Sequence, residues 1–245
     1  MTNTTRYENI QNIRDLGGLV TQDGRKIATA RLVRSANPGL ATSADIDRLK
    51  QYDFDAVIDF RTDSEKHPSE QTFSDMFNWV ADPVLVGNLS QDTVLPMLKA
   101  GTADHSRRFM LDFYRDFPVR YQTQYQRFLQ RAEQNQSMLY HCTAGKDRTG
   151  FASLLLLSAL GVDHDTIVAD YLESNLANTA NNTQVLAQVK KYGLPPATMA
   201  PLLLVEAAYL DAAIEVINNT YGGMKEYLEK ILKIDTALIC ANYLS

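Results

Sequence analysis

Residues 139–150, with the sequence LYHCTAGKDRTG, contain the groups of this chain that are best suited to chemistry. They follow a short apolar run that predicts a strand and precede a strongly apolar run that predicts a helix. A loop between a strand and a helix points successive backbone N–H groups, together with the positive end of the helix dipole, into one concavity. We therefore expect this loop to hold a tetrahedral oxyanion such as phosphate.

A cysteine and an arginine stand at the two ends of the loop. Donors that hold an oxyanion also stabilise a thiolate, so Cys142 is a candidate nucleophile for attack on phosphorus. Arg148 carries a planar fork that can bind two phosphate oxygens at once, a geometry that lysine does not reproduce. The predicted substrate-binding groups between these two are the backbone N–H groups of Thr143, Ala144, Gly145 and Lys146.

Several other residues in and after the loop suit the same chemistry. The hydroxyl of Thr149 can donate to the sulfur and help to expel the thiolate when a phosphocysteine is hydrolysed. Gly145 and Gly150 allow backbone to come close to the ligand and to the sheet. Residues 154–157 are four consecutive leucines, which give the helix a wide apolar face and a role in core packing.

The spacing His-Cys, five residues, Arg, from His141 to Arg148, resembles the signature of the cysteine-dependent protein tyrosine phosphatase superfamily. The Gly-Lys-Asp-Arg sequence within it is similar to that of the bacterial atypical tyrosine phosphatases. Members of that group act on phosphotyrosine and, in several cases, on phosphoinositides. The resemblance implies a phosphomonoester hydrolase with a phosphocysteine intermediate and no cofactor, whose partner is a phosphorylated protein or phosphoinositide substrate.

Other segments along nearly the whole chain are similar to elements of the same family, although only the loop motif is highly specific. They are residues 12–18, 32–36, 58–61 with Glu65, 170–175, and 221–223 with 227–228.

Three carboxyl groups compete to supply the proton that the leaving oxygen needs. Asp147 lies in the loop itself, and relatives with this loop are thought to use an aspartate there as the acid. Asp59 ends a predicted strand at the sheet edge where sites form, although orienting Arg14 or Arg148 is its alternative role. Asp82 is similar to the aspartate of the mobile Trp-Pro-Asp loop of other tyrosine phosphatases, with a different spacing.

The neighbouring charged residues have two interpretations each. Lys146 adds a positive charge beside the expected mouth of the site, which suits acidic phospho-substrates including inositol lipid heads; alternatively, its alkyl stem merely covers the loop. Arg14 contacts substrate or forms a structural ion pair with Asp15. His141 is expected to shape the loop around Cys142 through hydrogen bonds, because an ionised nucleophile needs no base.

The wider pattern predicts an α/β fold of the tyrosine phosphatase type, with a short, mostly parallel sheet flanked by helices. Apolar runs predict strands at residues 32–34, 56–60 and 138–141, and a weaker one within 78–86. Residues 1–245 are interpreted as a single phosphatase domain, in which residues 178–245 form a helical cap or lid. Helical spacing covers residues 43–52, 109–132 (interrupted at Pro118), 150–160, 163–175, 181–192, 199–218 and 224–232.

Composition excludes several classes of protein. The 245 residues carry 24 basic and 29 acidic side chains, a net charge of −5, which disfavours nucleic-acid binding. The longest charge-free apolar stretch, residues 149–162, is shorter than the ~20 residues of a membrane span. The first residues show no signal-peptide pattern, so we expect a cytoplasmic protein, with secretion left open.

The remaining candidate groups favour neither a metal nor a redox site. His67, His105 and His164 have no metal-ligand spacing, and Cys240 is expected to be a packed thiol in an apolar segment.

Two other functions remain open at this stage. A phospho-ligand-binding pseudophosphatase would keep the loop, but such proteins usually lose the nucleophile or the clamp. A thiol redox enzyme of the rhodanese or arsenate-reductase type would need sulfur transfer or a resolving thiol, for which Cys240 is a poor candidate.

Overall fold

The computed structural model describes residues 7–85, 99 and 101–245, and a five-stranded sheet forms the centre of this part of the chain. The strand order is β1-β2-β5-β3-β4, with β1 antiparallel to β2 and the other pairs parallel. The expected short, mostly parallel sheet is therefore confirmed. The strands are β1 (Arg14–Asp15), β2 (Leu32–Ser35), β3 (Ala56–Asp59), β4 (Trp79–Ala81) and β5 (Met138–His141).

Three of these strands lie where the apolar runs predict them, and β4 lies within the weaker prediction, whose last residue, Val86, is outside the described residues. The strand β1 was not predicted. It has two residues, which is too short for any periodic signal, and it forms because Arg14 and Asp15 pair with the edge of β2.

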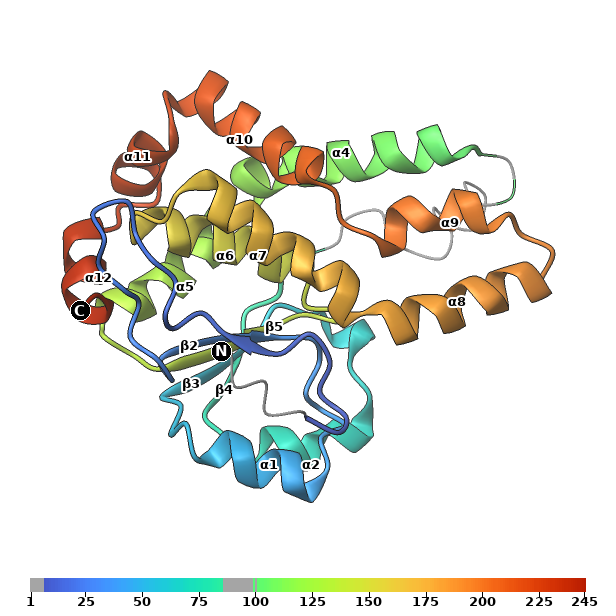
Figure 1. The fold of residues 1–245 in the computed structure, drawn as a ribbon, viewed down its shortest axis with the longest axis horizontal. Helices are drawn as coiled ribbons and strands as arrows, with labels where there is room; N and C mark the ends of the chain where they lie inside the picture. The colour runs from blue at the N-terminus through green and yellow to red at the C-terminus, as the bar shows by residue number, and fades with distance from the viewer. Residues whose placement is uncertain (1–6, 86–98, 100) are drawn as a thin grey trace.

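Side chains of the central strand alternate between two cores. Met138 and Tyr140 of β5 belong to the larger core, whereas Leu139 between them belongs to the smaller one. Helices α1 (Ser43–Lys50) and α2 (Gln71–Ser74) cover the smaller core, below the sheet in Figure 1. The larger core lies on the opposite face, under α4 (Ala103–Arg120), α5 (Gln122–Glu133), α6 (Arg148–Ala159) and α7 (His164–Ala177).

Helix α6 is buried on almost all sides, because it is apolar on every face after its first turn. The aromatic ring of Phe151 stacks on Phe117 of α4 at 5.2 Å and meets Tyr125 of α5 edge-on at 4.9 Å. These contacts fix the helix, and with it the start of the helix at Arg148, against the sheet.

Two helix predictions are corrected in detail. Pro118 does not interrupt its segment, because α4 continues through it to Arg120. The predicted helix at 199–218 is two helices, α9 (Pro196–Leu203) and α10 (Ala207–Tyr221). The side chain of Asn175 bonds the segment between the two helices. Its oxygen accepts from the N–H of Val205 at 2.8 Å, and its nitrogen donates to the carbonyl of Val205 at 2.9 Å.

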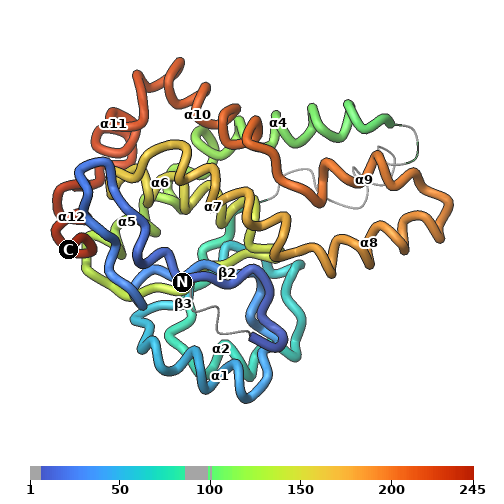
Figure 2. Tube along the Cα trace, viewed as in Figure 1, coloured from blue at the N-terminus to red at the C-terminus, as the bar shows by residue number. Residues whose placement is uncertain are grey.

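The segment after Asn178 is helical, and its parts lie in different places. Helices α8 (Thr179–Lys191) and α9 project from the sheet together with the first half of α4 (Figures 1 and 2). Helix α10 packs on α4 and α7, while α12 (Thr236–Tyr243) packs on α5 and α6. Short α11 (Met224–Glu226) and a π-helical turn, η3 (Tyr227–Ile231), connect them. No helix in the described ranges has both the length and the apolar character that crossing a membrane requires.

Candidate active site

The loop of residues 142–147, here called the phosphate loop, connects the end of β5 to the start of α6. It passes close to the end of β2, where Gly145 has a positive φ of 64°. A Cβ at this position would lie 2.3 Å from the carbonyl oxygen of Ser35. Only glycine therefore allows this turn beside the sheet.

Carbonyl groups of the phosphate loop accept hydrogen bonds from side chains of other segments. The Ala144 carbonyl accepts from the side-chain amides of Asn12 at 2.9 Å and Asn178 at 3.1 Å. The Gly145 carbonyl accepts from Asn12 at 3.0 Å and from Arg34 at 2.9 Å. Within the described chain, the backbone N–H groups of residues 143–148 have no acceptor, so they are available to an oxyanion.

A buried ion pair supports this arrangement behind the loop. Asp170 of α7 accepts from Arg34 at 2.6 Å and from Arg14 at 2.6 Å. Burial would raise the pKa of Asp170, but the charges and hydrogen bonds of Arg34 and Arg14 outweigh it and hold the pKa below its usual range. Arg14 thus binds Asp170 rather than Asp15, and its remaining exposure is 20%. It supports the loop from behind.

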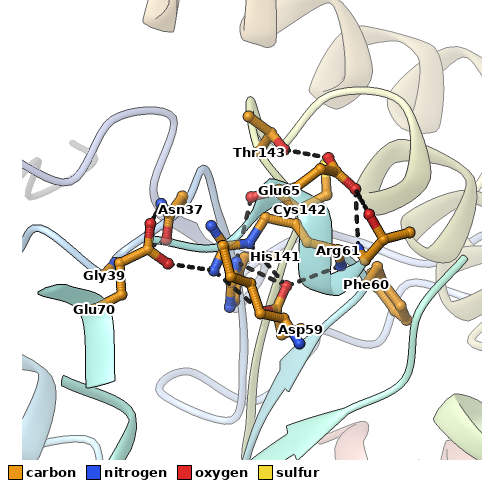
Figure 3. Close-up of polar contacts among 12 residues, drawn as sticks. Asn37, Gly39, Asp59, Phe60, Arg61, Glu65, Glu70, His141, Cys142 and Thr143 are labelled. Carbon is orange, nitrogen blue, oxygen red and sulfur yellow. Dashed lines mark hydrogen bonds and ion pairs between the residues drawn. The ribbon is translucent and has the colours of Figure 1, made fainter. Parts of the chain in front are cut away.

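Arg148, the predicted phosphate clamp, is oriented by Glu65. Its two terminal nitrogens donate to the two carboxylate oxygens at 2.7 and 2.6 Å. Thr143 donates its hydroxyl to the same carboxylate at 2.7 Å (Figure 3). Burial would raise the pKa of Glu65, but Arg148 and its other donors lower it to about 2. The clamp is therefore a fixed, charged guanidinium.

Glu65 was not among the predicted site residues. It ends a short 3-10 helix, η1 (Asp63–Glu65), that follows β3, and Thr62 caps that helix. The only sequence signal was its position in a segment similar to the phosphatase family, and nothing in that segment showed that it would reach Arg148.

Asp59 forms a different ion pair from the one expected. Instead of orienting Arg14 or Arg148, it accepts from Arg61 at 3.0 and 3.1 Å, and Arg61 also donates to Glu70 at 2.7 Å. Asp59 is fully buried. This carboxylate lies beneath the loop and anchors the end of β3.

His141 lies at the base of the phosphate loop. Its Nδ1 is 3.2 Å from the Cys142 carbonyl and 3.8 Å from Asp59, and its ring packs on Trp79 with centroids 5.1 Å apart. Burial lowers the pKa of His141 to about 4, although Asp59 opposes this shift. The neutral ring donates to the carbonyl of Cys142, which fits the expected role in shaping the loop.

Asp82 lies away from the phosphate loop, against α5. Arg127 of that helix bonds both of its carboxylate oxygens, one of them at 3.1 Å, and the carboxylate is buried. Asp82 therefore joins the segment after β4 to the helical layer, and this arrangement gives no support to its candidacy as the acid.

Asp147 lies at the edge of the phosphate loop with 16% of its side chain exposed. Its Oδ1 accepts from the hydroxyl of Tyr114 at 2.8 Å, and the ammonium of Lys146 lies 3.0 Å from Oδ1 and 2.8 Å from Oδ2. That ammonium also donates to the carbonyl of Leu202, in α9, at 3.0 Å. Lys146 is 7% exposed, so in this structure it joins the loop to α9 rather than standing free at the mouth.

The two cysteines are far apart. Cys142 is buried at the start of the loop, and both cysteines are free thiols. Cys240 bonds the carbonyl of Ala159, the last residue of α6, whose first residue is Arg148. A helix of 12 residues is about 18 Å long, so Cys240 is at the wrong end of α6 to resolve a disulfide with Cys142.

Comparison with known proteins gives the family. A sequence model of a protein family, described as the tyrosine phosphatase family, matches residues 5–243. This chain belongs to the tyrosine phosphatase family. The resemblance inferred from the phosphate loop is thereby confirmed.

Three relatives of the phosphatase show how far the similarity extends. A Cupriavidus necator protein named as a tyrosine-protein phosphatase is 47% identical over 239 residues, 98% of this chain and 88% of its own. A tyrosine-protein phosphatase of Nostoc commune is 30% identical over 209 residues, 81% of this chain and 68% of its own. The triple specificity protein phosphatase PtpB of Mycobacterium tuberculosis is 38% identical over 138 residues, about half of each chain (51% and 50%).

The role of Glu65 can be tested by Glu65→Gln. The amide keeps the size but loses the charge that holds both arginine nitrogens, and a charge-assisted pair contributes about 1.5–3 kcal/mol. We expect kcat/KM to fall about 10- to 100-fold, and inhibition by vanadate to weaken in parallel. The control is Glu206→Gln, since Glu206 forms an exposed pair with Arg107. Unchanged vanadate inhibition would contradict the role.

The buried neutral His141 predicts a loss of stability in acid. The pKa of His141 is about 4 in the folded protein and 6.5 ordinarily. Between these two pH values the imidazole therefore gains a proton in the unfolded chain and stays neutral in the folded one. This group alone should lower the free energy of unfolding by about 2 kcal/mol between pH 7 and pH 5.

Urea unfolding of His141→Gln at both pH values measures this contribution, because the variant should lose about 2 kcal/mol less than the unmodified protein. The matched control is His164→Gln, since the His164 side chain is 53% exposed. Equal pH dependence in the unmodified protein and in His141→Gln would contradict the prediction.

Proposed function

We propose that this phosphatase hydrolyses phosphotyrosine through a phosphocysteine intermediate formed on Cys142. One observation carries the proposal: the buried thiol begins a loop whose N–H groups have no acceptor within the described chain, and a fixed guanidinium closes its far end. Such a site matches a phosphoryl group, whose oxygens gain charge as the ester bond breaks.

In the first step, the Cys142 sulfur attacks phosphorus and the bond from phosphorus to the phenolic oxygen breaks. The N–H groups of residues 143–148 and the guanidinium of Arg148 bind the three phosphoryl oxygens. Asp147, protonated, gives its proton to the departing oxygen. The products of this step are a phosphocysteine, a neutral tyrosine side chain and an ionised Asp147.

In the second step, water attacks the phosphocysteine and the sulfur leaves as a thiolate. Asp147 accepts the proton that the water loses, which restores the acid for the next turnover. The hydroxyl of Thr149 has no partner in the described chain and is buried, which supports its predicted donation to the leaving sulfur. Inorganic phosphate then leaves the loop.

Phosphoinositides are the second substrate class that we propose. Lys146 supports this because its ammonium, bonded to Asp147 and to Leu202, could exchange the Leu202 carbonyl for an acidic group of a substrate. The relative that is named triple specificity protein phosphatase supports activity on more than one class of substrate.

We further propose that residues 1–245 work as one phosphatase domain in which α8 and α9 are the cap. Both ends of this pair contact the loop: Asn178, just before α8, bonds the Ala144 carbonyl, and Leu202 of α9 bonds Lys146. These two contacts support a cap that stands beside the loop.

The reaction and its substrates can be tested together. Phosphate release is measured from a phosphotyrosine peptide, a phosphoserine peptide and monophosphorylated phosphoinositides, with Cys142→Ser as the control. We expect release from the tyrosine peptide and from the lipids, and a loss of at least about a thousandfold in the variant. Binding of phosphopeptide without any release would favour a phospho-ligand-binding protein instead.

Asp147→Asn tests the identity of the acid. The amide cannot donate the proton that a tyrosine leaving group needs, so kcat for phosphotyrosine should fall about 100-fold. An aryl phosphate with an acidic nitrophenol leaving group needs no such proton, so its kcat should fall by less than about threefold. Equal losses on both substrates would remove Asp147 from the acid role, and Asp82→Asn serves as the comparison for the competing carboxyl.

A further inference from the structure

Two buried tyrosine hydroxyls form a chain of hydrogen bonds that ends at the carboxyl group of Asp147. Tyr114, in the middle of α4, places its hydroxyl 2.8 Å from Asp147 Oδ1. The hydroxyl of Tyr171, on α7, lies 2.5 Å from that of Tyr114. Neither was a predicted site residue: Tyr171 lies in the segment 170–175 that is similar to the family, and Tyr114 lies in a helix predicted from its periodicity.

The direction of these hydrogen bonds follows from the chemistry of the groups. Burial, with the nearby charge of Asp147, raises the pKa of both hydroxyls well above the ordinary value, so both keep their protons. An ionised carboxylate can only accept, so Tyr114 donates to Asp147. The one hydrogen of Tyr114 is then used, so Tyr171 donates to Tyr114.

Gly150 makes room for this chain of donors. It lies in the first turn of α6, three residues after Asp147, and a Cβ there would be 2.9 Å from two atoms of the Tyr171 ring. A larger residue would push the ring away from the loop. The glycine at the end of the loop motif thus serves the approach of Tyr171, in addition to any approach of backbone to the sheet.

The contact with Tyr114 orients the carboxyl group of Asp147. Oδ1 accepts from Tyr114 at 2.8 Å, and the ammonium of Lys146 lies 3.0 Å from Oδ1 and 2.8 Å from Oδ2. Tyr114 is fully buried in α4, so its hydroxyl holds the carboxyl group in one orientation. After the proton has moved to the leaving group, the Tyr114 hydroxyl stabilises the carboxylate that is left.

We propose that Tyr114 is a positioning residue for the general acid, aligned by Tyr171, and that it holds the carboxyl group of Asp147 in the orientation from which it protonates the leaving group. This assignment rests on the proposed function. It concerns the protonation of the leaving group alone, because neither hydroxyl bonds Cys142 or Arg148 within the described chain.

The test compares Tyr114→Phe with the unmodified enzyme on two substrates. For a phosphotyrosine peptide, kcat should fall roughly tenfold, the effect of one hydrogen bond to a charged group, with KM unchanged. For an aryl phosphate with an acidic nitrophenol leaving group, kcat should fall by less than about threefold, and inhibition by vanadate should not change. Tyr114→Phe should add no further loss to Asp147→Asn, since the two act as a unit.

Tyr227→Phe is the matched control. Its hydroxyl is also buried and bonds the carbonyl of Pro118, on the same helix as Tyr114, at 2.9 Å. This variant should keep full activity on both substrates. If Tyr114→Phe does not fold, Tyr171→Phe replaces it and should give a smaller loss with the same selectivity for the phosphotyrosine peptide.

Three results would overturn the assignment. One is unchanged activity of Tyr114→Phe on the peptide, and another is an equal loss on both substrates, which would indicate support of the loop as a whole. The third is a further loss when Tyr114→Phe is combined with Asp147→Asn. An unmodified protein without turnover of either substrate would overturn the proposed function itself, so the two failures are distinguishable.

Discussion

A loop that binds an oxyanion must turn its N–H groups to one side, and its carbonyl groups must then be satisfied on the other. In this protein the carbonyls of Ala144 and Gly145 meet donors from Asn12, Arg34 and Asn178. These donors come from before β1, from β2 and from the end of α7, so the loop is shaped by three separate parts of the chain. The fold itself therefore holds the loop in the conformation that we propose to bind phosphate.

Buried arginines impose a second requirement, because an unpaired charge away from water is strongly destabilising. The arginines near the loop are paired with carboxylates: Arg34 and Arg14 with Asp170, and Arg148 with Glu65. The pairing fixes the direction of the guanidinium. Its terminal nitrogens also donate to the carbonyl of Phe60 at 3.2 Å and to the hydroxyl of Thr143 at 3.3 Å, so a phosphoryl oxygen would bind Nε or replace one of these contacts. Glu65 also binds Thr143, so one carboxylate orients both ends of the loop.

Lys146 connects the phosphate loop to α9. Its ammonium touches the carboxylate of Asp147 and the carbonyl of Leu202, so the position of α9 and the environment of Asp147 are linked through one side chain. Tyr209 of α10 adds a second connection, donating to the carbonyl of Pro201 at 3.2 Å while its ring packs on Tyr114 at 5.5 Å. Movement of α9 would therefore change the contacts of Asp147 through both Lys146 and Tyr114.

The local sequence was sufficient to predict a strand, an anion-binding loop and a buried helix, because apolar periodicity and the spacing of Cys142 and Arg148 are properties of neighbouring residues. It also indicated Asp147. It did not indicate Glu65 or Tyr114, which lie 83 residues from Arg148 and 33 residues from Asp147, and it assigned Asp59 to the wrong arginine. The partners of buried charges and hydroxyls are chosen by the packing of whole elements, and residue type and local spacing carry no information about which distant segment will lie against them.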